Sequence, residues 1–180
     1  ERQQGMPIAV TADLFDTLAP RYDGIVKAEK NTAANAKVII GSWDHPDLLA
    51  ATKSGVRGIM IGPAEGEPNI SLGWWSLGDQ IGTAFARHPL FGNFPHDGML
   101  SPLWFRIIKH GLPLPINPEY GKFTFYAVGE GKQQYFAYIM EKQTKGEAPL
   151  LMTYGVDILA NTPEGVWLLD EMLQYLARDN

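Results

Sequence analysis

Two runs of consecutive apolar residues stand out in the first third of the chain. Residues 36–43 (AKVIIGSW) and 56–62 (VRGIMIG) are rich in aliphatic side chains and have no polar residue at their centres, which is typical of strands buried on both faces. Between them, Pro46 favours a helix start, Asp44 is placed to cap that helix and Gly55 is placed to end it. Strand, helix and strand in succession predict a βαβ unit with parallel strands and a right-handed crossover.

Shorter segments precede this unit. Residues 6–10 (MPIAV) and 22–28 (YDGIVKA) have the composition of short strands. Asp13 is placed to cap a helix over residues 14–18, which Pro20 would end. These segments predict a second alternation of strand and helix before the βαβ unit.

The last third of the chain combines strands with one strong helix. Alternation of apolar and polar residues predicts strands over 122–129 and 133–142 with a GEG turn between them, and the apolar run 148–158 predicts another strand. Thr162 precedes a proline and is a good N-cap for a final helix, whose apolar side is formed by Val166, Leu169, Leu173 and Leu176. Together these elements predict an α/β fold with an open, mostly parallel sheet sandwiched by helices.

The regular pattern stops between about residues 64 and 118, where Gly, Pro and aromatic residues dominate. Such a length without strong periodicity is typical of a functional or partner-facing insertion, and we expect only a short helix at 102–109 within it. The insertion starts just after the predicted strand ending near Ile61, and ligands of open α/β sheets bind beyond the carboxyl ends of their strands. We therefore expect a single α/β domain over residues 6–180, with residues 1–5 as a tail or linker remnant.

Composition narrows the function classes. The 180 residues are 45% hydrophobic, enough for one core, and 15 Lys and Arg against 20 Asp and Glu give a net charge of −5. The sequence lacks the dense basic stripe that is typical of nucleic-acid-binding proteins. No apolar run approaches the roughly 20 residues of a membrane span. The lack of Cys excludes disulfides, thiolate metal sites and a Cys nucleophile.

The chain begins at Glu1 without Met, so we expect a processed or excised module, for which the periplasm and the extracellular space are the candidate compartments.

Several signatures of catalysis and cofactor binding are missing. The turn after the second buried strand, residues 62–66 (GPAEG), has no Ser, Thr or Cys where a nucleophile elbow would present one. Glu65 stands near that place, but a carboxylate on a Gly- and Pro-rich turn is more often simply solvated. The four His residues have no metal-ligand spacing, and neither GxGxxG nor a P-loop occurs. We expect no cofactor and no metal.

The insertion holds the candidate ligand-binding residues. Trp74 and Trp75 are suited to stack on sugar rings, although burial as anchors of the insertion is the more common role of such residues. His96 and Asp97 form the best polar pair and are suited to bind a ligand hydroxyl, although Asp97 is also suited to fix its own turn. With Glu65, these four residues complete the candidate set. Trp104 is expected to be a buried anchor.

The order of segments in the chain resembles a known family. LGWWSLGDQIGTAFARHPLFGNFPHDG (residues 72–98), LWFRII (103–108) and TPEGVWLLDEMLQYLA (162–177) follow a βαβ start. This order resembles the glutamine-amidotransferase-like (ThuA-like, flavodoxin-like) domain at the C-terminal end of some family 2 glycoside hydrolases of the β-galactosidase and β-glucuronidase type. The resemblance implies an amidotransferase-like scaffold without the Cys nucleophile of true amidotransferases, beside a separate barrel domain that carries the glycosidase carboxylates.

Three functions follow as hypotheses. The first is a non-catalytic accessory domain of a carbohydrate-active enzyme, either structural or sugar-binding, whose partners are neighbouring domains of a larger hydrolase and a carbohydrate ligand. The second is a stand-alone hydrolase that uses Glu65, His96 and Asp97. The third is a small-ligand binding module beside Trp74 or Trp75. None of them involves nucleic acid or a membrane.

Overall fold

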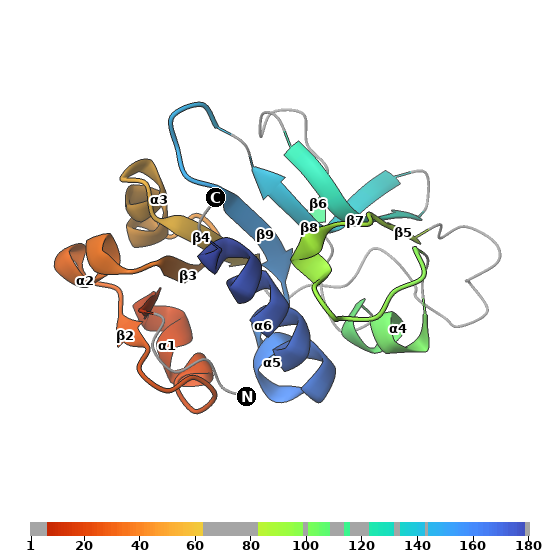
Figure 1. Ribbon diagram of the computed structural model, residues 1–180, viewed down its shortest axis with the longest axis horizontal. Helices are drawn as coiled ribbons and strands as arrows, with labels where there is room; N and C mark the ends of the chain where they lie inside the picture. The colour runs from red at the N-terminus through yellow and green to blue at the C-terminus, as the bar shows by residue number, and fades with distance from the viewer. Residues whose placement is uncertain are drawn as a thin grey trace.

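The computed structural model of the chain describes residues 7–62, 83–98, 101–108, 114–115, 123–131, 134–142 and 144–178. Within these residues, a nine-stranded sheet forms the centre of the molecule (Figure 1). Five neighbouring strands run parallel in the order β2 (Val26–Lys27), β1 (Ile8–Val10), β3 (Val38–Ser42), β4 (Arg57–Gly62) and β9 (Leu150–Tyr154). Four antiparallel strands extend the sheet: β8 (Gln134–Lys142), β7 (Phe123–Gly131) and β5 (Thr83–Phe85) in order, with β6 (Leu114–Pro115) paired to β8.

The parallel part has the strand order 2-1-3-4-5 along the chain, which is the flavodoxin-like order. In β3, four successive residues from Val38 to Gly41 are buried, and β4 is buried from Gly58 to its end. Because successive side chains of a strand point to opposite faces, both faces of this part of the sheet are covered. The predicted open, mostly parallel α/β sheet sandwiched by helices is confirmed.

The helices form two groups around the sheet. Contacts join α1 (Ala12–Leu18), α5 (Val156–Asn161) and α6 (Pro163–Ala177), and other contacts join α2 (Lys30–Asn35) and α3 (Pro46–Lys53). Figure 1 shows α6 in front of the sheet with α5 and α1 beside it. The helix α3 packs closely on the sheet through Leu48, because β3 and β4 offer glycines there. A Cβ atom at Gly41 would lie 2.9 Å from the Leu48 Cβ atom.

Hydrogen bonds stabilise both ends of the helix α6. The Thr162 hydroxyl accepts a hydrogen bond from the Gly165 amide (3.0 Å), which confirms the predicted N-cap. At the other end, the Arg57 guanidinium donates to the carbonyl oxygens of Leu176 (2.6 Å) and Arg178, and a cation there also stabilises the negative end of the helix dipole. No described helix combines the length and the apolar character needed to cross a bilayer.

Two predicted helix caps are wrong. Thr11, not Asp13, is the N-cap of α1, so Asp13 lies in the first turn of that helix. His45, not Asp44, is the N-cap of α3. An N-cap residue takes extended backbone angles, whereas Asp44 has a φ of 55° in the left-handed region and belongs to the turn before the helix.

Three strand boundaries also differ from the prediction. The strand expected over 22–28 is only β2, and the one expected over 148–158 ends at Tyr154. There Gly155, with a φ of 76°, turns the chain into α5. The GEG residues expected to form a turn lie within β7, and Gly131 pairs with Gln134 of β8. A glycine does not end a strand when its backbone continues the ladder of hydrogen bonds.

The described part of the insertion is more ordered than its composition predicts. It contributes β5, β6, the 3-10 helix η2 (Pro89–Phe91) and the expected short helix, α4 (Pro102–Ile108). Trp104 of α4 is 1% exposed and lies among buried rings, with ring centroids 4.2 Å from Phe85, 5.6 Å from Phe91 and 4.9 Å from Phe94. These side chains form an aromatic cluster that gives the insertion its own core, and the role of Trp104 as an anchor is confirmed.

Candidate functional site at the carboxyl ends of β1 and β3

The strand order locates a candidate site in the parallel part of the sheet. The chain leaves β1 to form β2 on one side, and β3 lies on the other side of β1. In open α/β sheets, ligands bind at such a switch point, beyond the carboxyl ends of the two strands. The polar residues there are Thr11 and Asp13 after β1, and Ser42 and His45 at the end of β3. We call these four residues the edge cluster.

The backbone at the two strand ends places these side chains side by side. The Thr11 amide donates to the Ile40 carbonyl oxygen (2.9 Å), which extends the pairing of β1 with β3 by one residue. The helix α1 starts immediately afterwards and presents Asp13 in its first turn. On the other strand, the His45 amide donates to the Ser42 carbonyl oxygen (3.2 Å), which closes a turn through Asp44. Thus a turn and a helix start aim Asp13 and His45 at each other.

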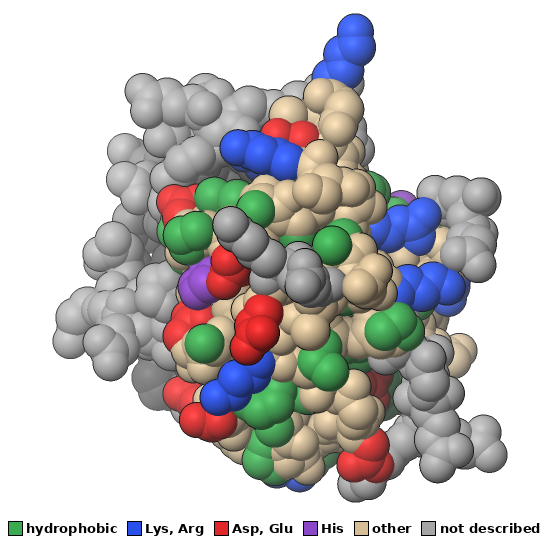
Figure 2. Space-filling model, turned by 90° about the vertical axis from the view of Figure 1, so that its left-hand side faces the viewer, with side chains coloured by type: hydrophobic (Ala, Val, Ile, Leu, Met, Phe, Trp, Pro, Cys, Tyr) green, Lys and Arg blue, Asp and Glu red, His purple; other side chains and the backbone are tan. Residues whose placement is uncertain are grey.

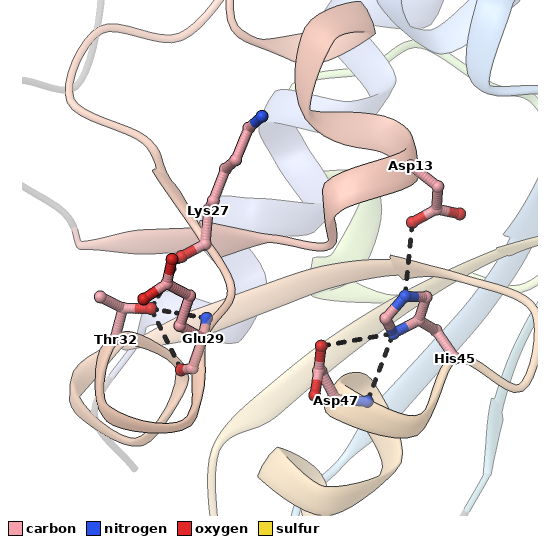
Figure 3. A network of polar contacts seen from close by, with 6 residues as sticks. All are labelled: Asp13, Lys27, Glu29, Thr32, His45 and Asp47. Carbon is pink, nitrogen blue, oxygen red and sulfur yellow. Dashed lines mark hydrogen bonds and ion pairs between the residues drawn. The ribbon is translucent and has the colours of Figure 1, made fainter.

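The His45 ring lies between two carboxylates from different helices (Figure 3). Its Nε2 atom is 3.7 Å from Oδ1 of Asp13. Its Nδ1 atom accepts a hydrogen bond from the Asp47 amide (3.3 Å) and lies 3.9 Å from Oδ2 of Asp47. Since Nδ1 accepts from an amide, the neutral ring carries its proton on Nε2, where it faces Asp13. Nδ1 is therefore hydrogen-bonded within the protein, and Nε2 faces Asp13 from beyond hydrogen-bond distance.

Asp13 is the exposed charge of the edge cluster. Its side chain is 44% exposed. Partial burial acts to raise the pKa of Asp13, but the neighbouring Ser42, Thr11 and backbone groups, together with His45, hold that pKa below its ordinary value. The carboxylate is therefore ionised at neutral pH and acts purely as a hydrogen-bond acceptor.

Nearby polar groups at the end of β2 serve local structure. The Glu29 amide donates to the Thr32 hydroxyl (2.8 Å), and that hydroxyl donates to the Lys27 carbonyl oxygen (2.7 Å) in the capping box that starts α2 (Figure 3). The Lys27 ammonium lies 5.0 Å from the centre of the Phe15 ring. Within the described residues, no group of three or more His, Asp or Glu side chains is arranged to hold a metal ion.

The face of the molecule on the side of β2 and α2 carries charges of both signs. In Figure 2, Asp and Glu side chains and Lys and Arg side chains both lie on this face, with apolar side chains scattered among them. Mixed charge of this kind offers no continuous track for phosphates. The face is better suited to neutral, hydrogen-bonding ligands than to polyanions.

Of the five residues predicted from sequence, the structure describes two, His96 and Asp97. Glu65, Trp74 and Trp75 lie outside the described residues. The His96 ring packs in the aromatic cluster, with its centroid 4.7 Å from that of Phe91, and Asp97 is exposed beside it. His96 and Asp97 thus belong to the antiparallel part of the molecule, whereas the edge cluster belongs to the parallel part (Figure 1).

Sequence reasoning missed the edge cluster because it treated Asp13, and Asp44 beside His45, as helix caps. A usable signal existed. Asp13 and His45 are each three residues beyond a buried parallel strand, and the carboxyl ends of neighbouring parallel strands meet at one edge of the sheet. The position of a polar residue after a strand was therefore more informative than its capping propensity.

A second group of titratable side chains, buried or partly buried, lies in the antiparallel part. The Tyr126 hydroxyl donates to the buried Glu141 carboxylate. The His88 ring lies 4.4 Å from the Tyr126 ring and 5.2 Å from the Tyr175 ring, and its Nδ1 accepts from the Leu90 amide (3.2 Å). Burial lowers the pKa of His88, and Glu141 partly offsets this. A neutral His88 therefore joins η2 to β7 and α6.

Comparisons with known proteins give no assignment. No known family model matches the sequence, and no curated protein is detectably similar to it.

Proposed function

We propose that the chain is a non-catalytic α/β accessory domain of a carbohydrate-active enzyme, and that its edge cluster binds hydroxyl groups of a carbohydrate. One observation carries the proposal: Asp13 is ionised and half exposed, while the adjacent His45 accepts a backbone amide at Nδ1 and turns Nε2 toward that carboxylate. A fixed carboxylate accepts hydrogen bonds from sugar hydroxyls. A neutral histidine whose one lone pair already accepts from a backbone amide is a poor general base, so we assign His45 the role of orienting the carboxylate.

The ionised state of Asp13 favours a role in binding over the role of general acid in glycoside hydrolysis. A general acid in a glycosidase needs a raised pKa so that it keeps its proton near neutral pH. The pKa of Asp13 is lowered. The other acid beside the ring, Asp47, lies at the opposite nitrogen of His45, so the imidazole separates the two carboxylates that would have to share a glycosidic bond.

The resemblance of the sequence to accessory domains of family 2 glycoside hydrolases supplies the biological setting. Those domains accompany a catalytic barrel, and this chain would make its contribution through substrate contact and through packing on neighbouring domains.

The test is calorimetric binding of the purified chain to a panel of β-linked oligosaccharides. We expect binding to one class, a loss of at least about tenfold in affinity for Asp13→Asn, and a smaller loss for Ser42→Ala. Asp47→Asn is the matched control, since Asp47 is 46% exposed and contacts the same imidazole from the other side. This variant should bind as the unmodified chain does.

Three outcomes would contradict the proposal. If no oligosaccharide binds, or if Asp13→Asn and Asp47→Asn bind equally well, the edge cluster is not a carbohydrate site. If the purified chain hydrolyses aryl glycosides and Asp13→Asn abolishes that activity, the domain is an enzyme.

A further inference from the structure

Trp167 on α6 is the one large aromatic side chain among the exposed large hydrophobic residues of the described chain. It is 41% exposed, whereas Trp104 of the aromatic cluster is 1% exposed. The helix α6 otherwise turns its apolar residues inward, and Trp167 stands at the margin of that buried side. A single exposed apolar residue needs no explanation by itself, so its surroundings decide what it does.

The indole ring is held in one orientation. Its Nε1 atom donates to Oε1 of Glu171, one turn further along α6 (3.2 Å). Its ring packs edge to face on Phe94, with centroids 5.1 Å apart and planes at 60°. The polar edge of the indole is therefore used inside the protein, and what remains exposed is apolar ring surface.

Glu171 is a buried anchor for this arrangement. The same oxygen that accepts from Trp167 also accepts from the Asn93 amide (3.0 Å). At the neighbouring Gly92, with a φ of 52°, an added Cβ atom would lie 1.7 Å from Oε2 of Glu171, so only glycine fits. A buried carboxylate is costly unless its hydrogen bonds are satisfied. Here those bonds fix both the loop and the indole.

Charged groups adjoin the exposed ring. Glu164 is three residues before Trp167 on α6, which places the two side chains on one face of the helix. Its Oε1 atom lies 3.0 Å from an Arg106 guanidinium nitrogen of α4. Backbone hydrogen bonding and Arg106 lower the pKa of Glu164. Since Arg106 is exposed and a guanidinium has five N–H donors, it retains donors for a ligand.

We propose that the Trp167 face is a stacking platform for a sugar ring, with Arg106 beside it as the hydrogen-bond donor to sugar hydroxyls. The sugar presents its C–H face to the indole, as the apolar surface of an aromatic ring favours. Because the ring is already fixed by Glu171 and Phe94, little side-chain freedom is lost on binding. The ligand class depends on the proposed function, but the site is separate from the edge cluster.

The test is an NMR titration of the 15N-labelled chain, which has five Trp residues and hence five indole N–H groups. Trp167→Phe identifies the Trp167 signal. We titrate with cellohexaose, xylohexaose and β-1,4-galactohexaose. We expect a saturable shift of the Trp167 indole signal with one of them and an unmoved signal for buried Trp104. Affinity should fall at least tenfold in Trp167→Ala and less in Trp167→Phe and Arg106→Gln. Val26→Ala, at the other exposed large apolar residue, is the control and should bind normally.

The outcomes separate this proposal from the proposed function. Shifts confined to the amides around Asp13 and Ser42 overturn the Trp167 platform and leave the edge cluster as the carbohydrate site. A Trp167 shift that persists in Asp13→Asn supports the platform even where the edge cluster fails. Line broadening that depends on protein concentration without sugar, and that Trp167→Ala removes, identifies a self-association face and overturns the platform.

Discussion

The two halves of the sheet differ in where they place their charged side chains. The parallel half buries aliphatic strands and keeps its charged side chains at the strand ends, where Asp13 remains half exposed. The antiparallel half buries two acids, Glu141 on β8 and Glu171 on the helix beside it, each with hydrogen-bond donors. In the first half, polar residues are available to a ligand. In the second, they fix loops and rings.

The cores of the two halves also differ in how their side chains pack. In the parallel half, glycines at Gly41 and Gly58 allow Leu48 to approach the sheet closely. In the antiparallel half, rings pack edge to face around Trp104. Close packing of small and aliphatic groups tolerates no added atoms, whereas a cluster of large rings depends on each ring for its volume. An enlarged side chain should therefore destabilise the parallel half, whereas a truncated ring should destabilise the antiparallel half.

Trp104→Ala should have the largest effect. Removing a fully buried large ring leaves a cavity and should lower the free energy of unfolding by about 3–5 kcal/mol. Ile40→Val in the parallel half, which removes one methylene group, should lower it by only about 0.5–1.5 kcal/mol. Urea denaturation followed by circular dichroism measures both. A loss below about 1 kcal/mol for Trp104→Ala would show that the aromatic cluster is not part of the cooperative core.

Gly41→Ala should come next, by the reverse mechanism. The new Cβ atom would lie 2.8 Å from Cγ2 of Thr11 and 2.9 Å from Cβ of Leu48. Overpacking of this kind costs about 1–3 kcal/mol. Thr11→Ser removes the nearer methyl group, so the double variant should recover part of the loss in the same denaturation assay. If the two effects simply add, the crowding between β1 and β3 is not the cause.

The parallel half was predictable from sequence because one physical rule covers it. Strands buried on both faces appear as continuous apolar runs, and the helix between β3 and β4 follows from its proline and glycine. The final helix was equally clear from Thr162 and its apolar side. Its start is capped by Thr162 alone, although Arg57 of β4 binds the carbonyls at its end.

The antiparallel half and the edge cluster were less predictable because long-range contacts decide them. Gly131 stays in β7 only because β8 pairs with it. The turn at Asp44, with its positive φ, makes His45 the N-cap of α3. The meeting of Asp13 with His45 depends on the pairing of β1 with β3, which no local pattern states. Trp74, Trp75 and Glu65 remain predictions.

His88 should make a pH-dependent contribution to the stability of the antiparallel half, and this contribution should be smaller than the two effects above. Burial lowers the pKa of His88 in the folded state below its ordinary value of 6.5. The stability that the neutral ring contributes is therefore present above about pH 6.5 and is lost as the pH falls through the lowered pKa. Because Glu141 opposes the shift and the ring is partly exposed, the loss should be smaller than that of Gly41→Ala.

Urea midpoints of the unmodified chain and of His88→Gln measure this effect between pH 8 and pH 5. The variant should be less stable at pH 8, but its midpoint should fall less than that of the unmodified chain on acidification. Parallel curves for the two proteins would show that His88 does not titrate differently in the folded and unfolded states.

His45→Asn should have the smallest effect on stability and separates structure from binding at the edge cluster. Asn is a better N-cap than most residues, so the variant should still accept the Asp47 amide and change the free energy of unfolding by at most about 0.5 kcal/mol. It lacks the ring nitrogen that faces Asp13. Since His45 is the weakest of the influences that lower the pKa of Asp13, that pKa should rise slightly, as NMR titration of the Asp13 carboxyl carbon would measure. An unchanged pKa together with weakened oligosaccharide binding would mean that His45 contacts the ligand directly rather than orienting Asp13.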